Sequence, residues 1–336
     1  MKRSLVLVVI IAGVLISIGA IESQPVSNLQ ANPALRPVEV PPDNPQTDAK
    51  VALGSQLFFD PRLSRDNTIS CATCHDPQLA WANHNAVDIG IEGRSGTRNS
   101  GTILDAAYMD FQFWDGRART LEEQALGPIH NPVEMGETLE DVVRKLNAID
   151  GYRTQFRAVF GGDVTADGIA KAISAFERTV LSGLSPYDKY SAGDRSAMPE
   201  AAAKGMRLFN GKARCRMCHG GPMFSDQGFH NLGVGMDRPQ PDIGREAVTK
   251  VARDRGRFKT PGLRNVALTW PYMHDGSVKT LIDVVEFYNR GGVKNPTLDI
   301  FVMPLDLTDG ESKDLVAFLE ALTGSLPKID RPVLAK

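Results

Sequence analysis

Two short stretches of the chain contain residues whose types and spacing point to one kind of chemistry. Residues 71–75 read CATCH and residues 215–219 read CRMCH. Both have the form C-x-x-C-H, which is the attachment motif of a c-type haem. The two thiols form thioethers with the vinyl groups of the porphyrin, and the adjacent His supplies an imidazole to the iron. The sequence therefore predicts two covalent haems. The expected attachment residues are Cys71, Cys74, Cys215 and Cys218, with His75 and His219 as proximal iron ligands.

Other uses of the cysteines stay open from the motifs alone. The chain has 4 Cys, and the two motifs contain all of them. The same residues fit two disulfides, one zinc site with all the thiolates as ligands, or two redox-active C-x-x-C pairs. None of these alternatives explains why a His follows each pair directly. Haem attachment is therefore the preferred interpretation.

The length of 336 residues is typical of about two domains, at ~100–200 residues each. One haem motif would then fall in each domain. A hydrophobic content of 42% and a charged content of 23% are ordinary for a globular protein. The formal net charge is −2 and the chain has no basic block, which argues against a nucleic-acid-binding protein.

The N-terminus has the pattern of an export signal. Lys2 and Arg3 precede an apolar run that extends from Leu5 to Ile18. We predict that residues 1–23 form a signal peptide, with an uncleaved inner-membrane anchor as the alternative because the run approaches the ~18 residues of a membrane span. Export to the periplasm agrees with the haem motifs, since bacteria attach haem covalently outside the cytoplasm.

Apolar spacing predicts a mainly α-helical fold. Positions i, i+3, i+4 and i+7 are apolar from residue 139, from residue 169, from residue 281 and again after residue 308. Thr138, Thr280 and Thr308 stand where N-caps belong, and Glu311 completes a capping box with Thr308. Residues 220–260 are rich in Gly, Pro and Asp, so we expect loops with short strands there.

A short internal repeat suggests how the domains are divided. A helical stretch with Gly54, Leu57 and Phe58 precedes the first haem motif, and Gly205-x-x-Leu208-Phe209 precedes the second. We predict two cytochrome c-like domains at residues 47–185 and 200–327, each with one attached haem. Residues 24–46 would be an extended lead-in and residues 186–199 a linker. The last helix is a candidate for packing back on the first domain.

Further motifs, taken in order, identify a family that the chain resembles. They are RN at 98–99, FWDGR at 113–117, Gln124, GP at 127–128, NPVEMG at 131–136 and PYMHDG at 271–276. With the two haem motifs, this set resembles the bacterial di-haem cytochrome c peroxidase / MauG family over about residues 45–325.

The resemblance implies roles for several residues. Glu134 matches the acid–base group that moves a proton between the two peroxide oxygens. Gln124 matches a residue that lines the same pocket, and Pro128 one that packs over the open iron face. Trp114 matches the tryptophan between the two haems. Without the resemblance, Glu134 would be a surface carboxylate, Gln124 an ordinary helix residue and Trp114 a core aromatic, which remains the expectation for Trp81 and Trp270.

The family also holds a calcium ion between its haems. The matching positions are the side chain of Asn99 and the backbone carbonyls of Thr269 and Pro271. Oxygen donors of this kind suit a hard cation. The resemblance alone implies this calcium site.

The second haem departs from the conventional peroxidase pattern. There a Met lies fourteen residues after the His of the His-Asp-Gly motif, whereas the chain has Tyr288 at that distance from His274. MauG resembles the chain here, with Tyr as axial ligand. A phenolate stabilises the oxidised iron and lowers its potential. The alternative is that Tyr288 packs in its helix face and that Met303 or Met273 binds the iron.

The first haem departs as well. Conventional peroxidases have a distal His about sixteen residues after the proximal His, but position 91 is Ile and the nearest His is His84. We expect an open iron held by His75 alone, with His84 as the alternative resting ligand. His130 and His230 receive no role.

Taken together, these residues predict an exported di-haem peroxidase. It would reduce hydrogen peroxide at haem one with electrons from a small donor such as a cytochrome c or a cupredoxin, delivered through haem two. The first alternative is a MauG-like oxidase that spends the oxidising equivalents on side chains of a partner protein, which Tyr288 favours. The second alternative is a non-catalytic periplasmic electron carrier.

Overall fold

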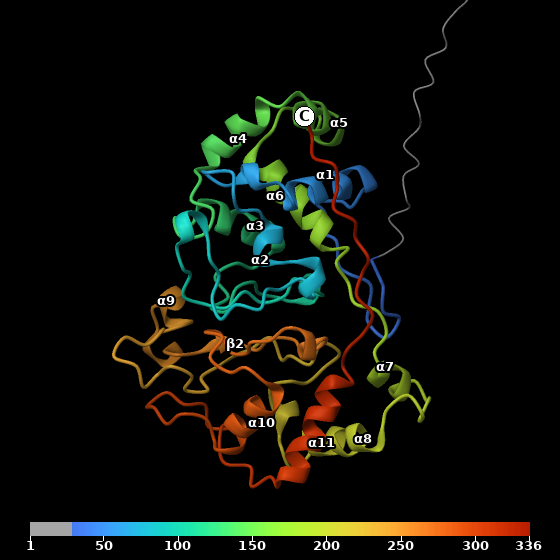
Figure 1. The fold of residues 1–336 in the computed structure, drawn as a ribbon, viewed down its shortest axis with the longest axis vertical. Coiled ribbons are helices and arrows are strands. Elements are labelled where there is room, and N and C mark those ends of the chain that lie inside the picture. The colour runs from blue at the N-terminus through green and yellow to red at the C-terminus, as the bar shows by residue number, and fades with distance from the viewer. Residues whose placement is uncertain (1–28) are drawn as a thin grey trace, which may run out of the picture.

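The computed structural model describes residues 29–336, which form an elongated molecule of two stacked halves (Figure 1). The upper half contains α1 (Asp48–Phe58), α2 (Cys71–Cys74), α3 (Leu121–His130), α4 (Leu139–Asn147), α5 (Asp150–Phe160) and α6 (Ala166–Glu177). The lower half contains α7 (Pro186–Ser191), α8 (Glu200–Asn210), α9 (Glu246–Thr249), α10 (Leu281–Asn289) and α11 (Asp309–Glu320). β1 (Phe229–His230) and β2 (Phe258–Lys259) pair in antiparallel fashion. The mainly helical prediction is confirmed.

The helix starts follow the N-caps expected from the sequence. The side chain of Thr138 accepts a hydrogen bond from the third backbone amide of α4, and Thr280 does the same for α10. Thr308 and Glu311 form the reciprocal capping box of α11. These bonds satisfy amides that have no partner inside their own helix.

Each half is built on one close helix crossing. α1 packs on α6 in the first half, and α8 packs on α11 in the second. A Cβ atom on Gly54 would lie 1.8 Å from the carbonyl oxygen of Ala172, and one on Gly205 would lie 1.9 Å from that of Asp314. Only glycine allows this approach. The crossing explains why the Gly-x-x-Leu-Phe pattern recurs before both haem motifs.

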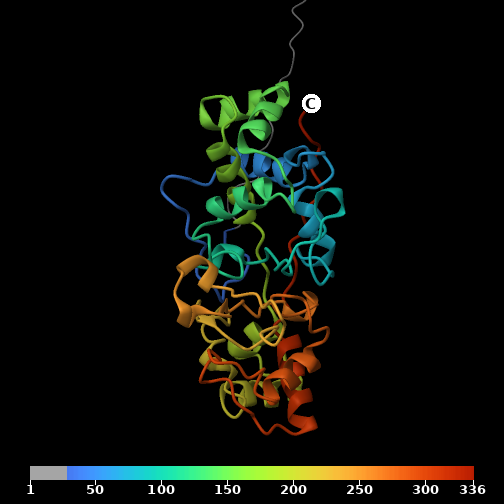
Figure 2. The same cartoon turned by 90° about the vertical axis from the view of Figure 1, so that its left-hand side faces the viewer.

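The chain returns to the first half through its tail and not through its last helix. α11 packs on α8, in its own half. The extended segment that follows it runs along the molecule and ends beside α5 (Figures 1 and 2). There Gly151 N donates to Lys336 O at 2.8 Å, Arg62 Nη2 donates to Ala335 O at 2.9 Å, and Ala335 joins the buried core of the first half.

Of the predicted lead-in, linker and signal peptide, the structure describes only the first two, from residue 29 onward. Residues 29–46 contain no helix or strand, and the predicted linker at 186–199 begins with α7. The predicted signal peptide or anchor at residues 1–23 lies outside the described residues. Among residues 29–336, no helix has the length and apolarity that crossing a membrane requires.

Gly205→Ala should force α8 and α11 apart, because the added methyl group meets a backbone carbonyl that cannot turn away. We expect the free energy of unfolding to fall by about 3 kcal/mol in chemical denaturation followed by circular dichroism. Gly162→Ala is the matched control, since nothing lies within 4 Å of its added Cβ. Equal effects of the two substitutions would show that the crossing is not sterically limited.

Candidate haem sites

The first haem motif lines a cavity of about 560 Å³ in the upper half, a volume that includes space open to solvent. α2 contributes Cys71 and Cys74, and His75 follows directly. α3 contributes Gln124 and Pro128, and Glu134 comes from the turn after that helix. Residues far apart in the sequence that were predicted to act on one haem therefore line one cavity.

The two candidate proximal imidazoles are oriented in the same way. Nδ1 of His75 lies 3.3 Å from the carbonyl oxygen of Trp81, and Nδ1 of His219 lies 2.9 Å from that of Phe224. Burial lowers the pKa of both histidines, so both rings are neutral. A neutral ring that donates from Nδ1 leaves the lone pair of Nε2 for a metal. Both sites fit a haem with axial imidazole.

Glu134 has the surroundings of a group that exchanges protons. Burial raises the pKa of its carboxyl, and the positive charge of Arg117 opposes part of that rise. Asn131 Nδ2 donates to Glu134 Oε1 at 2.6 Å and fixes the carboxyl in place. A positioned carboxyl with a raised pKa is a better proton acceptor than an ordinary carboxylate and still releases its proton.

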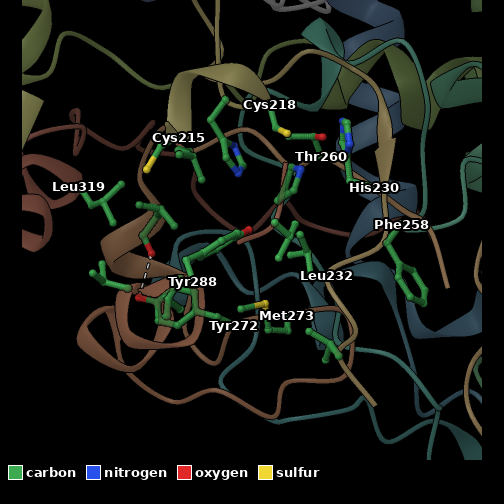
Figure 3. Close-up of a pocket in the computed structure, with 18 of the residues that line it drawn as sticks. Cys215, Cys218, His230, Leu232, Phe258, Thr260, Tyr272, Met273, Tyr288 and Leu319 are labelled. Atoms are coloured by element: carbon green, nitrogen blue, oxygen red, sulfur yellow. Dashed lines mark hydrogen bonds between the residues drawn. The ribbon is translucent and has the colours of Figure 1, made fainter. Parts of the chain in front are cut away.

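The second motif lines a larger cavity of about 1840 Å³, which includes space open to solvent. Cys215, Cys218 and His219 lie on its wall, and Tyr288 of α10 projects into it (Figure 3). Leu232 and Leu319 make part of the wall apolar. Apolar walls around a reactive pair of cysteines suit a porphyrin ring.

Three side chains offer a second axial ligand in this cavity, and they differ in how free they are. The Tyr288 hydroxyl makes no hydrogen bond within residues 29–336, and burial raises its pKa, so that the free side chain is a neutral phenol. Met303 is 39% exposed, and its sulfur accepts from Arg214 Nη1 at 2.8 Å. Met273 also lines the cavity. Tyr288 and Met273 are thus the two partly buried donors that make no side-chain hydrogen bond within residues 29–336.

Trp114 links the two halves of the molecule. Its Nε1 donates to the carbonyl of Asn99 at 2.8 Å, and its own carbonyl accepts from Lys259 N at 2.7 Å. Its side chain also lines the larger cavity. Trp114 is thus tied to the first half through its indole and to the second half through its backbone carbonyl.

The predicted calcium positions line the same cavity as Trp114. Asn99 Nδ2 donates to the carbonyl of Asn85 at 2.9 Å, which leaves its Oδ1 as an acceptor. Within residues 29–336, no hydrogen bond reaches Asn99 Oδ1 or the carbonyl oxygens of Thr269 and Pro271. Three oxygens without hydrogen-bond donors, on residues that line one cavity, are the kind of ligand that a hard cation prefers.

Other residues considered from the sequence lie elsewhere. The two cysteine pairs line separate cavities and all four thiols are free, so a shared zinc site and disulfides are contradicted. Trp81 is fully buried, as expected for a core aromatic. The same expectation is wrong for Trp270, which is 43% exposed and stacks on His84 at 3.8 Å between ring centroids. His84 does not line the first cavity, and His130 is exposed.

Sequence reasoning missed two groups that lie against the cavities. His230 bridges two carboxylates, with Nδ1 2.6 Å from Asp299 and Nε2 2.9 Å from Asp226. Glu177 lines the first cavity, and burial raises its pKa to about 8. Aligning the two helix crossings at their phenylalanines pairs Glu177 with Leu319. The sequence could therefore have indicated, through this alignment, that Glu177 lies at a cavity wall. No residue close to His230 in the sequence indicated its contacts with Asp226 and Asp299.

Glu177→Gln should stabilise the protein more at pH 8 than at pH 5. The wild-type carboxyl keeps its proton in the folded state up to its raised pKa but loses it near pH 4 when unfolded, so stability falls as pH rises between the two. The unfolding free energy of the variant minus that of the wild type should therefore rise with pH, by up to about 1.4 kcal/mol per pH unit. Chemical denaturation at several pH values measures it.

Glu320→Gln is the control, because Glu320 is an exposed carboxyl at the end of α11. It should leave the pH dependence of stability unchanged. A Glu177→Gln variant that followed the wild-type curve at every pH would show that Glu177 is ionised in the folded protein.

Comparisons with known proteins agree with this geometry. The sequence profile of the family described as di-haem cytochrome c peroxidase matches residues 48–196. The methylamine utilization protein MauG of Methylophilus methylotrophus is 38% identical over 302 residues, which are 88% of the chain and 89% of that protein. The cytochrome c551 peroxidase of Nitrosomonas europaea is 37% identical over 310 residues, 91% of the chain and 89% of that protein.

Solved structures show the same fold. A MauG-like protein associated with microbial copper homeostasis superposes with a TM-score of 0.81 at 35% identity, covering 88% of the chain and 95% of that structure. The di-haem peroxidase BthA of Burkholderia thailandensis superposes with a TM-score of 0.74 at 26% identity, covering 88% and 94%. The chain thus belongs to the di-haem cytochrome c peroxidase / MauG family and is a haem peroxidase with two c-type haems.

Proposed function

We propose that the protein reduces hydrogen peroxide to water at haem one, with electrons that a small redox protein delivers through haem two. One observation carries this proposal: Glu134 and Gln124 line the same cavity as the candidate haem ligand His75. An acid–base carboxyl beside an accessible iron is what O–O cleavage requires.

The haems are assigned to the two motifs. Cys71 and Cys74 would attach haem one, and His75 would bind its iron. Cys215 and Cys218 would attach haem two, and His219 and Tyr288 would bind its iron. When bound, haem one supplies the iron at which peroxide binds and the electrons that reduce it.

Glu134 carries out the proton transfer. It accepts the proton of the inner peroxide oxygen and returns it to the outer oxygen, so that the outer oxygen leaves as water. The bond from Asn131 keeps the carboxyl in position for both steps. Gln124 orients the peroxide from α3. Two electrons and two further protons convert the peroxide into two water molecules.

Trp114 passes electrons between the haems. Its contacts with Asn99 and Lys259 keep the indole between the two halves. A calcium ion bound by Asn99, Thr269 and Pro271 would stiffen the same region, because it ties a loop of the first half to a loop of the second. The free oxygens at these positions support that assignment.

The cellular setting follows from the haems and from the N-terminal sequence. Lys2 and Arg3 followed by an apolar run support export, and the attachment of c-type haem outside the cytoplasm supports a periplasmic location. A small cytochrome c or cupredoxin in that compartment is the proposed electron donor.

One observation favours a second function. The unengaged phenol of Tyr288 in the haem-two cavity fits an anionic ligand that lowers the potential of this haem. A low potential impairs electron entry and favours storage of an oxidising equivalent. The second candidate is therefore a MauG-like oxidation of side chains in a partner protein.

Peroxide consumption with a reduced mono-haem cytochrome c tests the first proposal. We expect multiple turnovers in the wild type and a rate about 10²–10⁴-fold lower in Glu134→Gln, with both haems still attached, because the amide cannot relay the proton. Stopped-flow absorbance measures both rates. Glu140→Gln, an exposed carboxyl of α4, is the control and should keep the wild-type rate.

An undiminished rate in Glu134→Gln would remove Glu134 from the mechanism. Negligible wild-type turnover, with a long-lived oxidised species after one equivalent of peroxide, would instead support oxidation of a partner protein.

Tyr288→Phe separates the two assignments of the haem-two ligand. Loss of the phenolate should alter the EPR and optical spectra of haem two, raise its midpoint potential and leave haem one unchanged. Met303→Leu is the parallel variant and should change neither haem. The reverse pattern would identify Met303 as the ligand and Tyr288 as a packing residue.

A further inference from the structure

The wall of the haem-two cavity contains a cation without a counter-ion. Lys259 of β2 lines this cavity together with Thr260 and Phe258 (Figure 3 labels the latter two). Its Nζ takes part in no ion pair or hydrogen bond with any residue from 29 to 336. Burial alone lowers the pKa of Lys259 to about 8. Lys259 is partly buried, and its ammonium group has no protein acceptor within the described residues.

Two other partly or fully buried lysines have protein acceptors for their ammonium groups. Lys50 Nζ donates to Asn44 Oδ1 at 2.9 Å and to the carbonyl of Pro45 at 2.6 Å. Lys145 Nζ pairs with Glu137 and also donates to the carbonyl of Ser64. A buried charge without such partners is costly, so it persists only where something else neutralises it.

The backbone holds Lys259 firmly at this wall. Its amide donates to the carbonyl of Trp114 at 2.7 Å, and β2 pairs it with Phe229 of β1. The neighbouring Phe258 stacks on His274 at 3.6 Å between ring centroids. The side chain consequently cannot leave the cavity by a movement of its strand alone.

Nearby carboxylates are already engaged. Asp226 and Asp299 bind His230 from its two sides. The carboxylate of Asp242 forms a bidentate pair with Arg98. Burial is the only cause of the lowered pKa of Lys259, so no charged group among residues 29–336 acts on it. An acceptor for its ammonium group comes either from solvent or from whatever fills the cavity.

A haem brings two propionate carboxylates into its site. We propose that Lys259 donates to a propionate of haem two and acts as its counter-ion. The inference rests on the proposed attachment of haem two in this cavity and goes beyond it by naming the side chain that sets the charge of the cofactor. A positive charge here opposes the extra positive charge of the oxidised iron, so it raises the midpoint potential of haem two.

Lys259 also connects the cofactor to the electron path. The same residue would hold a propionate through its side chain and the carbonyl of Trp114 through its amide. It is a positioning residue, because it touches the cofactor edge and not the reacting oxygen atoms. Its loss should therefore change the potential of haem two without removing the proton relay at haem one.

Spectroelectrochemical titration of the di-haem protein tests the proposal. In Lys259→Met the reduction equilibrium of haem two should shift about tenfold towards the oxidised form, which is about 59 mV for one electron. Lys259→Arg should restore the wild-type potential, because it keeps the charge. Lys279→Met, which removes an exposed lysine from the same half, is the control for net charge and should cause no comparable shift.

Haem content is measured first, to separate assembly from electrostatics. If Lys259→Met does not retain haem two, Lys259→Gln replaces it; loss of haem in both, with retention in Lys259→Arg, also supports the ion pair. A wild-type potential in Lys259→Met or Lys259→Gln overturns the proposal, and so does failure of Lys259→Arg together with the neutral variants. Wild-type peroxide turnover, measured separately, decides the proposed function whatever these potentials show.

Discussion

The two haem cavities depend on one packing constraint, which is the approach of two helices at a glycine. At Gly54 and at Gly205 the partner helix lies so near that a methyl group would collide with its carbonyl oxygen. The approach brings Phe176 of α6 against α1 and Phe318 of α11 against α8. The residue after each phenylalanine, Glu177 or Leu319, then lines the haem cavity. The same contact thus closes the core and forms one wall of the haem site. The rest of each half is arranged around that wall.

The scaffold is repeated, but the chemistry of the two cavities is not. In the first half the wall carries Glu177 and faces Glu134, so that carboxyls with raised pKa values surround the site. In the second half the equivalent wall residue is Leu319, and the cavity contains the phenol of Tyr288. Proton-carrying groups suit a site where an O–O bond is cleaved. An apolar wall and a second axial donor suit a site that only passes electrons.

Both side-chain and backbone contacts cross the boundary between the halves, among them the bidentate pair of Arg98 with Asp242. The carbonyl of Trp114 accepts from the second half, while its indole donates within the first. The C-terminal tail adds a second connection, because Ala335 is buried in the core of the first half. Two such ties hold the two candidate haem cavities at one separation, which the proposed electron relay through Trp114 requires. The proposed electron path therefore depends on contacts from both halves.

The sequence by itself determined the features that depend on residues close together in the chain. The haem motifs, the helical periodicity and the caps at Thr138, Thr280 and Thr308 are of this kind, because each involves at most two helical turns. The resemblance to a known family added Glu134 and Gln124. Only the tertiary structure decided the exposure of Trp270, the return of the tail, and the surroundings of Glu177 and Lys259. Those depend on which distant segments meet, and burial and unpaired charge arise only where they do.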